Sequence, residues 1–280
     1  MILGAHVSSA GGVELAPARG RKVGCEAIQT FSRSPRMLRG AKLVTAEQGL
    51  LFQEAMRKHK QKVAVIHGNY LMNLCAPDKN LLKVAGNALV DEMENAQAMG
   101  VRHVIFHPGS HRGKGLKWGI KTIAASLDAA VKKADAPDVV LTLENTAGQG
   151  DTVGDTLESL RDILTATKAR ARLAVCLDTC HAFAAGYDFR TDEKYDRFLG
   201  LVESTIGLDT VKAFHLNDSK TPLGSRRDRH EDTGKGEMGL RPFELLVNDA
   251  RWRDTPGCLE YPGTDGGYRK NLKLLRSMIH

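Results

Sequence analysis

Short apolar runs rich in branched residues alternate along this chain with longer amphipathic stretches. We expect the short runs to be buried β-strands, because strands of a parallel sheet covered on both faces read as nearly continuous apolar segments. The eight predicted strands cover residues 2–5, 27–30, 63–66, 104–106, 139–143, 173–177, 211–214 and 258–259. This alternation predicts a series of βα units rather than two unlike domains.

The stretches between the predicted strands carry apolar residues at helical spacing. Two such series are clear, namely Leu82, Ala85, Leu89, Ala96 and Met99, and then Leu157, Leu160 and Leu164. Each series places its apolar side chains on one face of a helix, which would pack on the outside of the sheet. The chain contains no low-complexity tract and no linker rich in Pro, Gly or Ser. We therefore predict an α/β fold, a single (β/α)8 TIM barrel domain spanning residues 1–280, with a doubly wound open sheet as the alternative.

Six of the predicted strands are followed or ended by a side chain that can bind a metal ion. These positions recur about once per βα unit and are His67, His107, Glu144, Asp178, His215 and Glu260. In a barrel, the carboxyl ends of all strands open onto one face, where active sites are built. We therefore expect these six side chains to meet at that face, although they are far apart in the sequence.

Three further candidates fall in loops on the same face. They are His181 in the segment DTCH, and Asp228 and His230 in the segment DRH. The resulting set of five imidazoles, two aspartates and two glutamates suits Zn²⁺, with Mn²⁺ or Fe²⁺ as substitutes, and is too rich in nitrogen for Ca²⁺. Nine ligands can hold two or three ions if one carboxylate bridges, and clustered divalent ions are suited to the hydrolysis of phosphate esters.

Charge and composition indicate the kind of binding partner and the cellular compartment. The net charge of +7 and the pI near 9.2 favour a polyanionic partner such as nucleic acid. The long polar segment 216–239 resembles a functional loop, and basic residues that could contact phosphates gather in it and in two other loops: Lys220, Arg226, Arg227, Arg229, Arg33, Arg36, Arg39, Arg112, Lys114 and Lys117. The chain has no apolar run long enough for a membrane span, its first residues do not read as a secretory signal, and its five cysteines are sparse. We expect a cytoplasmic protein without a membrane partner.

Several residues close to the candidate ligands have a simpler interpretation. Cys176 and Cys180 read as small buried apolar residues, because mixed nitrogen and oxygen sites with several ions rarely need thiolates. His103 and His111 flank a candidate ligand and are expected to face solvent. His6 follows the first strand and is expected either to support the ligands or to be structural.

Five segments resemble, in order, the endonuclease IV family of apurinic/apyrimidinic (AP) DNA repair endonucleases. They are GAHVSSAGG, HPGSHRGKG, LENTAGQG, LDTCHAFAAGYD, and HLNDSK followed by GSRRDRH, and the resemblance spans the whole chain. It implies a (β/α)8 barrel with three zinc ions that acts in base excision repair on double-stranded DNA. The implied reaction hydrolyses the phosphodiester 5′ to an abasic site and leaves a 3′-hydroxyl and a 5′-deoxyribose phosphate.

The resemblance also implies roles for individual positions. His67 and His107 would bind the first zinc, and Glu144 would bridge it to the second and serve as the catalytic carboxylate. Asp178, His215 and Glu260 would complete the second zinc site, and His181, Asp228 and His230 would hold the third. A hydroxide between the first two ions would attack phosphorus. Arg36, Tyr70 and Leu71 would enter the DNA at the lesion. We further expect a monomer, associated with the nucleoid in a prokaryote.

Two other functions are compatible with parts of this pattern. Sugar isomerases and epimerases of the xylose isomerase-like barrel type share the fold and similar ligands at strand ends, but typically use one or two metals. The third ligand set and the basic loops argue against them. A non-catalytic zinc or DNA-binding protein would tolerate the loss of a ligand, and all nine candidates are present.

Overall fold

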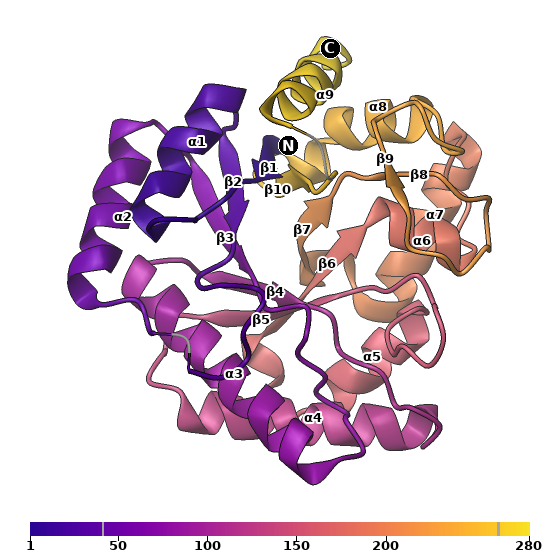
Figure 1. The fold of residues 1–280 in the computed structure, drawn as a ribbon. Coiled ribbons are helices and arrows are strands. Elements are labelled where there is room, and N and C mark those ends of the chain that lie inside the picture. The colour runs from indigo at the N-terminus through magenta and orange to yellow at the C-terminus, as the bar shows by residue number, and fades with distance from the viewer. Residues whose placement is uncertain (41, 262–263) are drawn as a thin grey trace.

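The computed structural model describes residues 1–40, 42–261 and 264–280, and its main feature is a closed barrel of eight parallel strands (Figure 1). The strands are β1 (Ile2–His6), β2 (Ala27–Thr30), β3 (Val63–His67), β4 (His103–Phe106), β5 (Val140–Glu144), β6 (Leu173–Asp178), β7 (Val211–His215) and β10 (Pro256–Leu259). All eight predicted strands are confirmed. The alternative of an open sheet is wrong, because β1 pairs with both β2 and β10 and leaves no edge.

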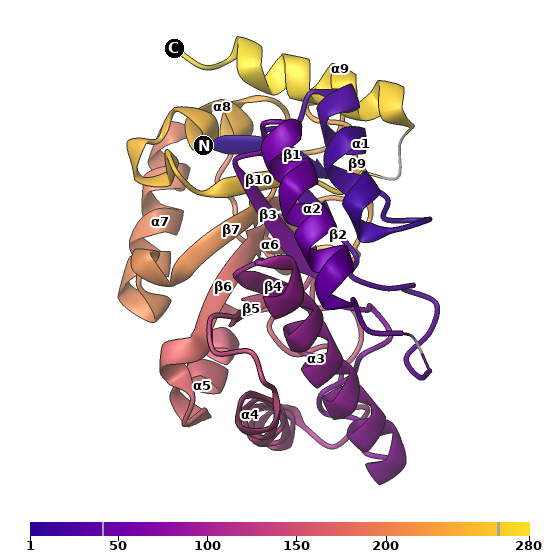
Figure 2. The same cartoon turned by 90° about the vertical axis from the view of Figure 1, so that its left-hand side faces the viewer.

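Helices surround the barrel as an outer layer (Figures 1 and 2). They are α1 (Ala16–Val23), α2 (Ala46–Lys58), α3 (Lys79–Met99), α4 (Leu116–Lys133), α5 (Leu157–Ala166), α6 (Thr179–Ala185), α7 (Asp192–Ile206), α8 (Arg241–Asn248) and α9 (Asp265–Ser277), with short 3₁₀ turns at Val13–Leu15, Arg170–Arg172, Leu208–Thr210 and Ala250–Trp252. The predicted apolar stripes are confirmed, since Leu89 of α3 and Leu160 of α5 are fully buried. In the described part of the chain, no helix is both long and apolar enough to cross a membrane.

The first turns of several helices are fixed by polar side chains that cap their N-termini. Thr45 and Gln48 form a reciprocal capping box at the start of α2, and the side chain of Asp78 accepts the backbone N–H of Leu81 in α3. Asp178 ends β6 and caps α6 in the same way. In the last case, the helix begins directly at the face where the strand ends.

The interior of the barrel is layered because side chains along a strand alternate between its two faces. A middle layer of small and apolar residues consists of Ala27, Val65, Ile105, Cys176, Ala213 and Cys258. Two residues further along each of these strands stands a polar side chain. Together with the corresponding residues of β1 and β5, these make a set that we name the strand-end ring: His6, Gln29, His67, His107, Glu144, Asp178, His215 and Glu260. The apolar layer closes the barrel beneath this ring.

The opposite end of the barrel corrects one expectation. His103 is partly buried instead of fully solvent-facing, because it begins β4 and its Nδ1 lies 3.0 Å from Oγ1 of Thr142 on β5. Burial, with the charges of Arg102 and Lys212, lowers the pKa of His103 to about 4. His103 is therefore a neutral structural group. The two cysteines near the candidate ligands, Cys176 and Cys180, are both fully buried, as expected.

The long polar segment after β7 is ordered by one buried carboxylate. Asp218 accepts backbone N–H groups from Ser219, Gly234, Gly236 and Met238. The segment also contains a two-stranded antiparallel hairpin of β8 (Asp218–Ser219) and β9 (His230–Glu231). Asp218 and the hairpin fix the segment that carries two of the predicted ligands.

The loop after β2 is anchored to α3 by a buried ion pair. Nε of Arg33 donates to Glu92 at 2.9 Å, and the same guanidinium donates to Asp91 at 2.8 Å. Ser32 also donates to Glu92, and both partners of the Arg33–Glu92 pair are almost completely buried. The expectation that Arg33 contacts a phosphate is therefore wrong, because its charge is already neutralised inside the protein. Its role is to hold the loop that carries Arg36.

The buried Arg33–Glu92 pair predicts how substitutions at these two residues change the stability of the protein. Arg33→Met should lower the free energy of unfolding by about 3–5 kcal/mol, because it leaves Glu92 as an unpaired buried charge. The double variant Arg33→Met/Glu92→Met should recover most of that loss, since it removes both charges. Urea unfolding followed by circular dichroism measures both. Lys22→Met breaks the exposed pair with Asp265 and is the control, with an expected change below about 1 kcal/mol. An Arg33→Met variant as stable as this control would contradict the assignment.

Candidate metal centre

The structure brings all nine predicted ligands together at the carboxyl end of the barrel. They form overlapping groups whose ligand atoms lie within 4.8 Å of one another: His67 with His107 and Glu144; Glu144 with Asp178, His215 and Glu260; and Asp178 with His181 and His230. Asp228 joins the third group, with its two carboxylate oxygens 3.2 Å from Nε2 of His181 and 3.1 Å from Nε2 of His230. Six of the nine come from the strand-end ring. The other three do not all lie in loops as expected, because His181 is in the first turn of α6 and His230 begins β9, and only Asp228 is in a loop.

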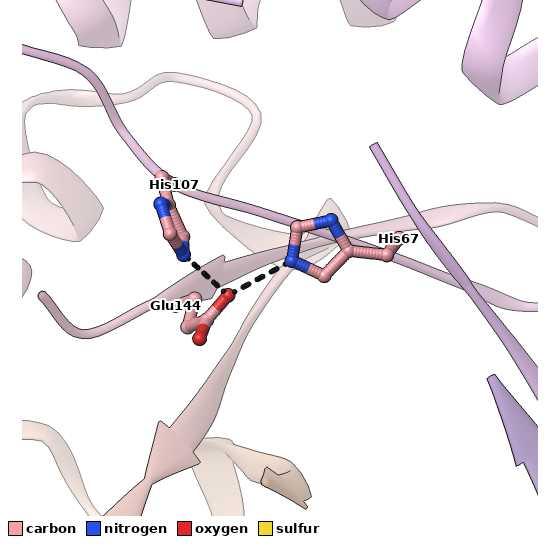
Figure 3. Close-up of side chains that lie close together, drawn as sticks. All are labelled: His67, His107 and Glu144. Atoms are coloured by element: carbon pink, nitrogen blue, oxygen red, sulfur yellow. Dashed lines mark hydrogen bonds and ion pairs between the residues drawn. The ribbon is translucent and has the colours of Figure 1, made fainter. Parts of the chain in front are cut away.

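Glu144 lies at the centre of this arrangement and is completely buried. Figure 3 shows His67 and His107 converging on one of its oxygens, with Nε2 to Oε2 distances of 3.1 Å and 3.0 Å. The other oxygen, Oε1, lies 2.9 Å from Nδ1 of His215. Each oxygen of one carboxylate therefore faces a different part of the ligand set. This is the geometry that a carboxylate needs in order to bridge two cations.

The imidazoles and carboxylates of the site hold one another in charged forms. Burial opposes the ionisation of Glu144, but the neighbouring charges of His107 and His215 hold its pKa well below the usual range. Burial likewise opposes protonation of His67, but the hydrogen bond and charge of Glu144 raise its pKa to about 9. In the protein alone, protons on the imidazoles therefore supply the positive charge that balances the buried carboxylates.

In two of the imidazoles, a backbone carbonyl accepts a hydrogen bond from Nδ1 and so fixes the orientation of the ring. Nδ1 of His67 donates to the carbonyl of Gly68 at 2.7 Å, and Nδ1 of His181 donates to the carbonyl of Asn145 at 2.9 Å. Because Nδ1 keeps its proton in each case, Nε2 is the atom left to bind a cation, even though Nδ1 of His181 also lies 3.3 Å from Oε1 of Glu144. The Nε2 atoms of His181 and His230 are buried and have no hydrogen-bond partner of suitable geometry in the described chain. Each of these nitrogens lies near a carboxylate oxygen of Asp228 without a well-aligned hydrogen bond, an arrangement that fits a divalent cation bound between them.

Asparagine side chains support the acidic ligands from behind. Nδ2 of Asn217 donates to Asp178 at 2.6 Å and to Glu260 at 3.3 Å, and its Oδ1 accepts the backbone N–H of Glu260. The side chain of Asn145 accepts the backbone N–H of Asp178 at 2.6 Å. Such contacts orient metal ligands and add to their affinity. Sequence reasoning missed these residues because an amide next to a carboxylate has no motif of its own.

The candidate DNA-contacting residues lie on two neighbouring loops, and those of one loop line a cavity. Tyr70 and Leu71 line a cavity of about 480 Å³ that also reaches three of the predicted ligands, and their side chains are about half exposed. Arg36 is exposed on the loop after β2 and does not line this cavity. The two loops are nevertheless joined, because Nδ2 of the buried Asn69 donates to the carbonyls of residues 34 and 37. Of the basic candidates, Arg112 and Arg229 line the cavity.

Comparisons with known proteins agree on family and fold. The model of a family described as "xylose isomerase-like TIM barrel" matches residues 17–278. Proteins named "Probable endonuclease 4" from Geobacter sulfurreducens and Halorhodospira halophila are 42% and 40% identical, covering 99% and 98% of this chain and 94% and 92% of their own lengths. The solved structure of endonuclease IV from Thermus thermophilus is 33% identical, with a TM-score of 0.88 over 99% of this chain and 98% of that one.

Sugar-converting enzymes share the fold at much lower identity. A D-tagatose 3-epimerase-like protein superposes with a TM-score of 0.76 over 99% of this chain and 97% of that one, but is 17% identical, which shows the barrel alone. The full-length relatives near 40% identity separate this chain from such enzymes. The chain belongs to the endonuclease IV family.

Proposed function

We propose that this protein is a zinc-dependent AP endonuclease of base excision repair. It would hydrolyse the phosphodiester 5′ to an abasic site in duplex DNA, leaving a 3′-hydroxyl and a 5′-deoxyribose phosphate. The observation that carries this proposal is the placement of Glu144, whose two buried oxygens face separate groups of imidazoles. Relatives named endonuclease 4 support the same reaction class. We also propose that residues 1–280 act as one monomeric domain in the cytoplasm, associated with the nucleoid in a prokaryote.

The proposed metal content is three zinc ions per chain, with Mn²⁺ or Fe²⁺ as possible substitutes. The first site would use His67 and His107 with Glu144 as the bridge, and the remaining ligands would be divided between the second site (Asp178, His215, Glu260) and the third (His181, Asp228, His230). Bound divalent ions would supply positive charge at the scissile phosphate and activate water for attack on it. Four carboxylates leave about two positive charges uncompensated among three such ions, which favours a phosphodiester over a neutral sugar.

The protein's own contribution is to position the DNA. An abasic site has lost the stacking of one base, so an inserted side chain displaces less there than in intact duplex. Tyr70 and Leu71 stand at the cavity that leads to the candidate ligands, and Arg36 stands on the adjoining loop. Arg112 and Arg229 add positive charge to the cavity wall. We therefore assign Arg36, Tyr70 and Leu71 to the recognition of the lesion.

The direct test combines metal analysis with cleavage. Purified protein should hold about three zinc ions per chain and should nick a duplex oligonucleotide that contains a tetrahydrofuran abasic analogue. Removal of the metal with a chelator should abolish nicking, and added zinc should restore it. An intact duplex of the same sequence is the control substrate. Metal-loaded protein that leaves the abasic strand intact but interconverts sugars would replace this proposal with an isomerase or epimerase.

The role of Glu144 is tested by Glu144→Gln. The amide keeps the shape of the side chain but lacks the charge needed to bridge two cations, so the cleavage rate should fall by about 100-fold or more. Binding to abasic DNA should remain measurable in a gel-shift assay. Glu158→Gln, an exposed position in the first turn of α5, is the matched control and should leave cleavage unchanged. Wild-type turnover by Glu144→Gln would remove this residue from the mechanism.

The role of the inserted side chains is tested by Tyr70→Ala. Truncation should mainly weaken discrimination between abasic and intact duplex, by about 10-fold, because the loss of one stacking side chain costs about 1–3 kcal/mol. The ratio of the two dissociation constants is the measurement, and zinc content should not change. Leu201→Ala, a partly exposed apolar position on α7, serves as the control. If discrimination by Tyr70→Ala equals that of the control, Tyr70 does not contact the lesion.

A further inference from the structure

Two members of the strand-end ring, His6 and Gln29, lie outside the predicted ligand set. Gln29 is completely buried at the end of β2, and its amide contacts three other ring members. Its Nε2 donates to Oε1 of Glu260 and lies 3.0 Å from Nδ1 of His6. Its Oε1 lies 2.8 Å from Nε2 of His215. A neutral side chain with no ligand role therefore touches two predicted ligands of the second metal site.

The orientation of the Gln29 amide follows from its partners. A carboxylate oxygen only accepts hydrogen bonds, so the amide nitrogen must face Glu260 and the amide oxygen must face His215. An amide oxygen only accepts as well, so Nε2 of His215 must carry a proton. The remaining nitrogen, Nδ1, is then the one that can bind a cation, and it faces Glu144 at 2.9 Å and Glu260 at 3.1 Å.

Gln29 performs for His215 what the main chain performs for other histidines of the site. His67 and His181 donate Nδ1–H to the backbone carbonyls of Gly68 and Asn145, whereas His215 donates Nε2–H to a side chain. A backbone acceptor cannot be removed by substitution, but a side-chain acceptor can. Gln29 also holds Glu260 in place from the same amide group. Gln29 thus sets the protonated nitrogen of His215 and, together with Asn217, the position of Glu260.

We propose that Gln29 is a positioning residue for the second metal site, acting through His215 and Glu260. This inference rests on the metal centre proposed above and extends it to a residue that binds no ion itself. Contacts of this kind typically change metal affinity by about 10- to 100-fold. The effect should be selective, because within the described chain the hydrogen bonds of the Gln29 side chain go to His6, His215 and Glu260, and to no ligand assigned to the first or third site.

The test is a zinc titration that needs neither DNA nor turnover. Metal-free wild type, Gln29→Met and Thr30→Val are titrated with zinc against a chromogenic chelator. Gln29→Met keeps the approximate size of the side chain and removes both hydrogen-bonding groups. Thr30→Val is the matched control, because Thr30 is the next buried polar residue of β2 and bonds to the carbonyl of Val7 instead of a ring member. We expect one of three zinc ions to be weakened by about 10- to 100-fold in Gln29→Met, and none in Thr30→Val.

A second readout separates positioning from a general effect on folding. Cobalt substituted for zinc should show an altered visible absorption spectrum in Gln29→Met, while thermal unfolding shows the variant to be folded. If Gln29→Met does not fold, Gln29→Ala replaces it in both measurements. Three zinc ions bound with wild-type affinity by the folded variant would overturn the proposal. Equal weakening of all three ions would also overturn it, because that result indicates a structural role. Wild type that binds zinc without nicking DNA would remove the proposed activity but leave this test valid.

Discussion

The structure depends on the closure of eight parallel strands into a barrel whose side chains alternate between inside and outside. Closure fixes the register of every strand against two neighbours, so the inward positions fall into layers. A residue two positions beyond the middle layer must then reach the same level at the end of the barrel, whichever strand carries it. Residues as distant in sequence as Glu144 and Glu260 meet for this reason, with no requirement for a continuous binding motif.

Burying the strand-end ring raises the free energy of the folded protein unless the charges of the ring are balanced. Glu144, Asp178 and His215 are completely buried, so water does not screen their charges. The imidazoles supply part of the compensation as protons, and the pKa shifts of Glu144 and His67 reflect it. Divalent cations would supply more charge in the same space, since each replaces protons at several nitrogens at once. The same groups therefore explain both the electrostatics of the protein alone and its suitability for metal.

The elements and six of the nine candidate ligands could be predicted from the sequence because both follow a local period, whereas His181, Asp228 and His230 are indicated by short motifs. Apolar runs ended by His, Asp or Glu mark the strands, and the βα repeat places their ends together. Gln29 follows the same period, two residues after Ala27, but a neutral amide is not among the usual zinc ligands, so its place at the strand end does not by itself predict a role. The burial of Arg33 could not be predicted, because its partner Glu92 lies on α3 and only the packing of that helix against the loop brings them together.

The loops around the entrance to the site are held by polar contacts, whereas the barrel interior is held by strand pairing and apolar packing. Its loops are held by single buried polar side chains: Asn69 joins the loops after β2 and β3, and Asp218 orders the segment after β7. A buried polar side chain with all its hydrogen bonds made restricts a loop to few conformations. Any other conformation would break a hydrogen bond and leave a buried donor or acceptor without a partner. Such loops can present Tyr70 and Leu71 in a fixed position without a large core of their own. In the function proposed above, the barrel would provide the chemistry, and these polar contacts would provide the shape that selects damaged DNA.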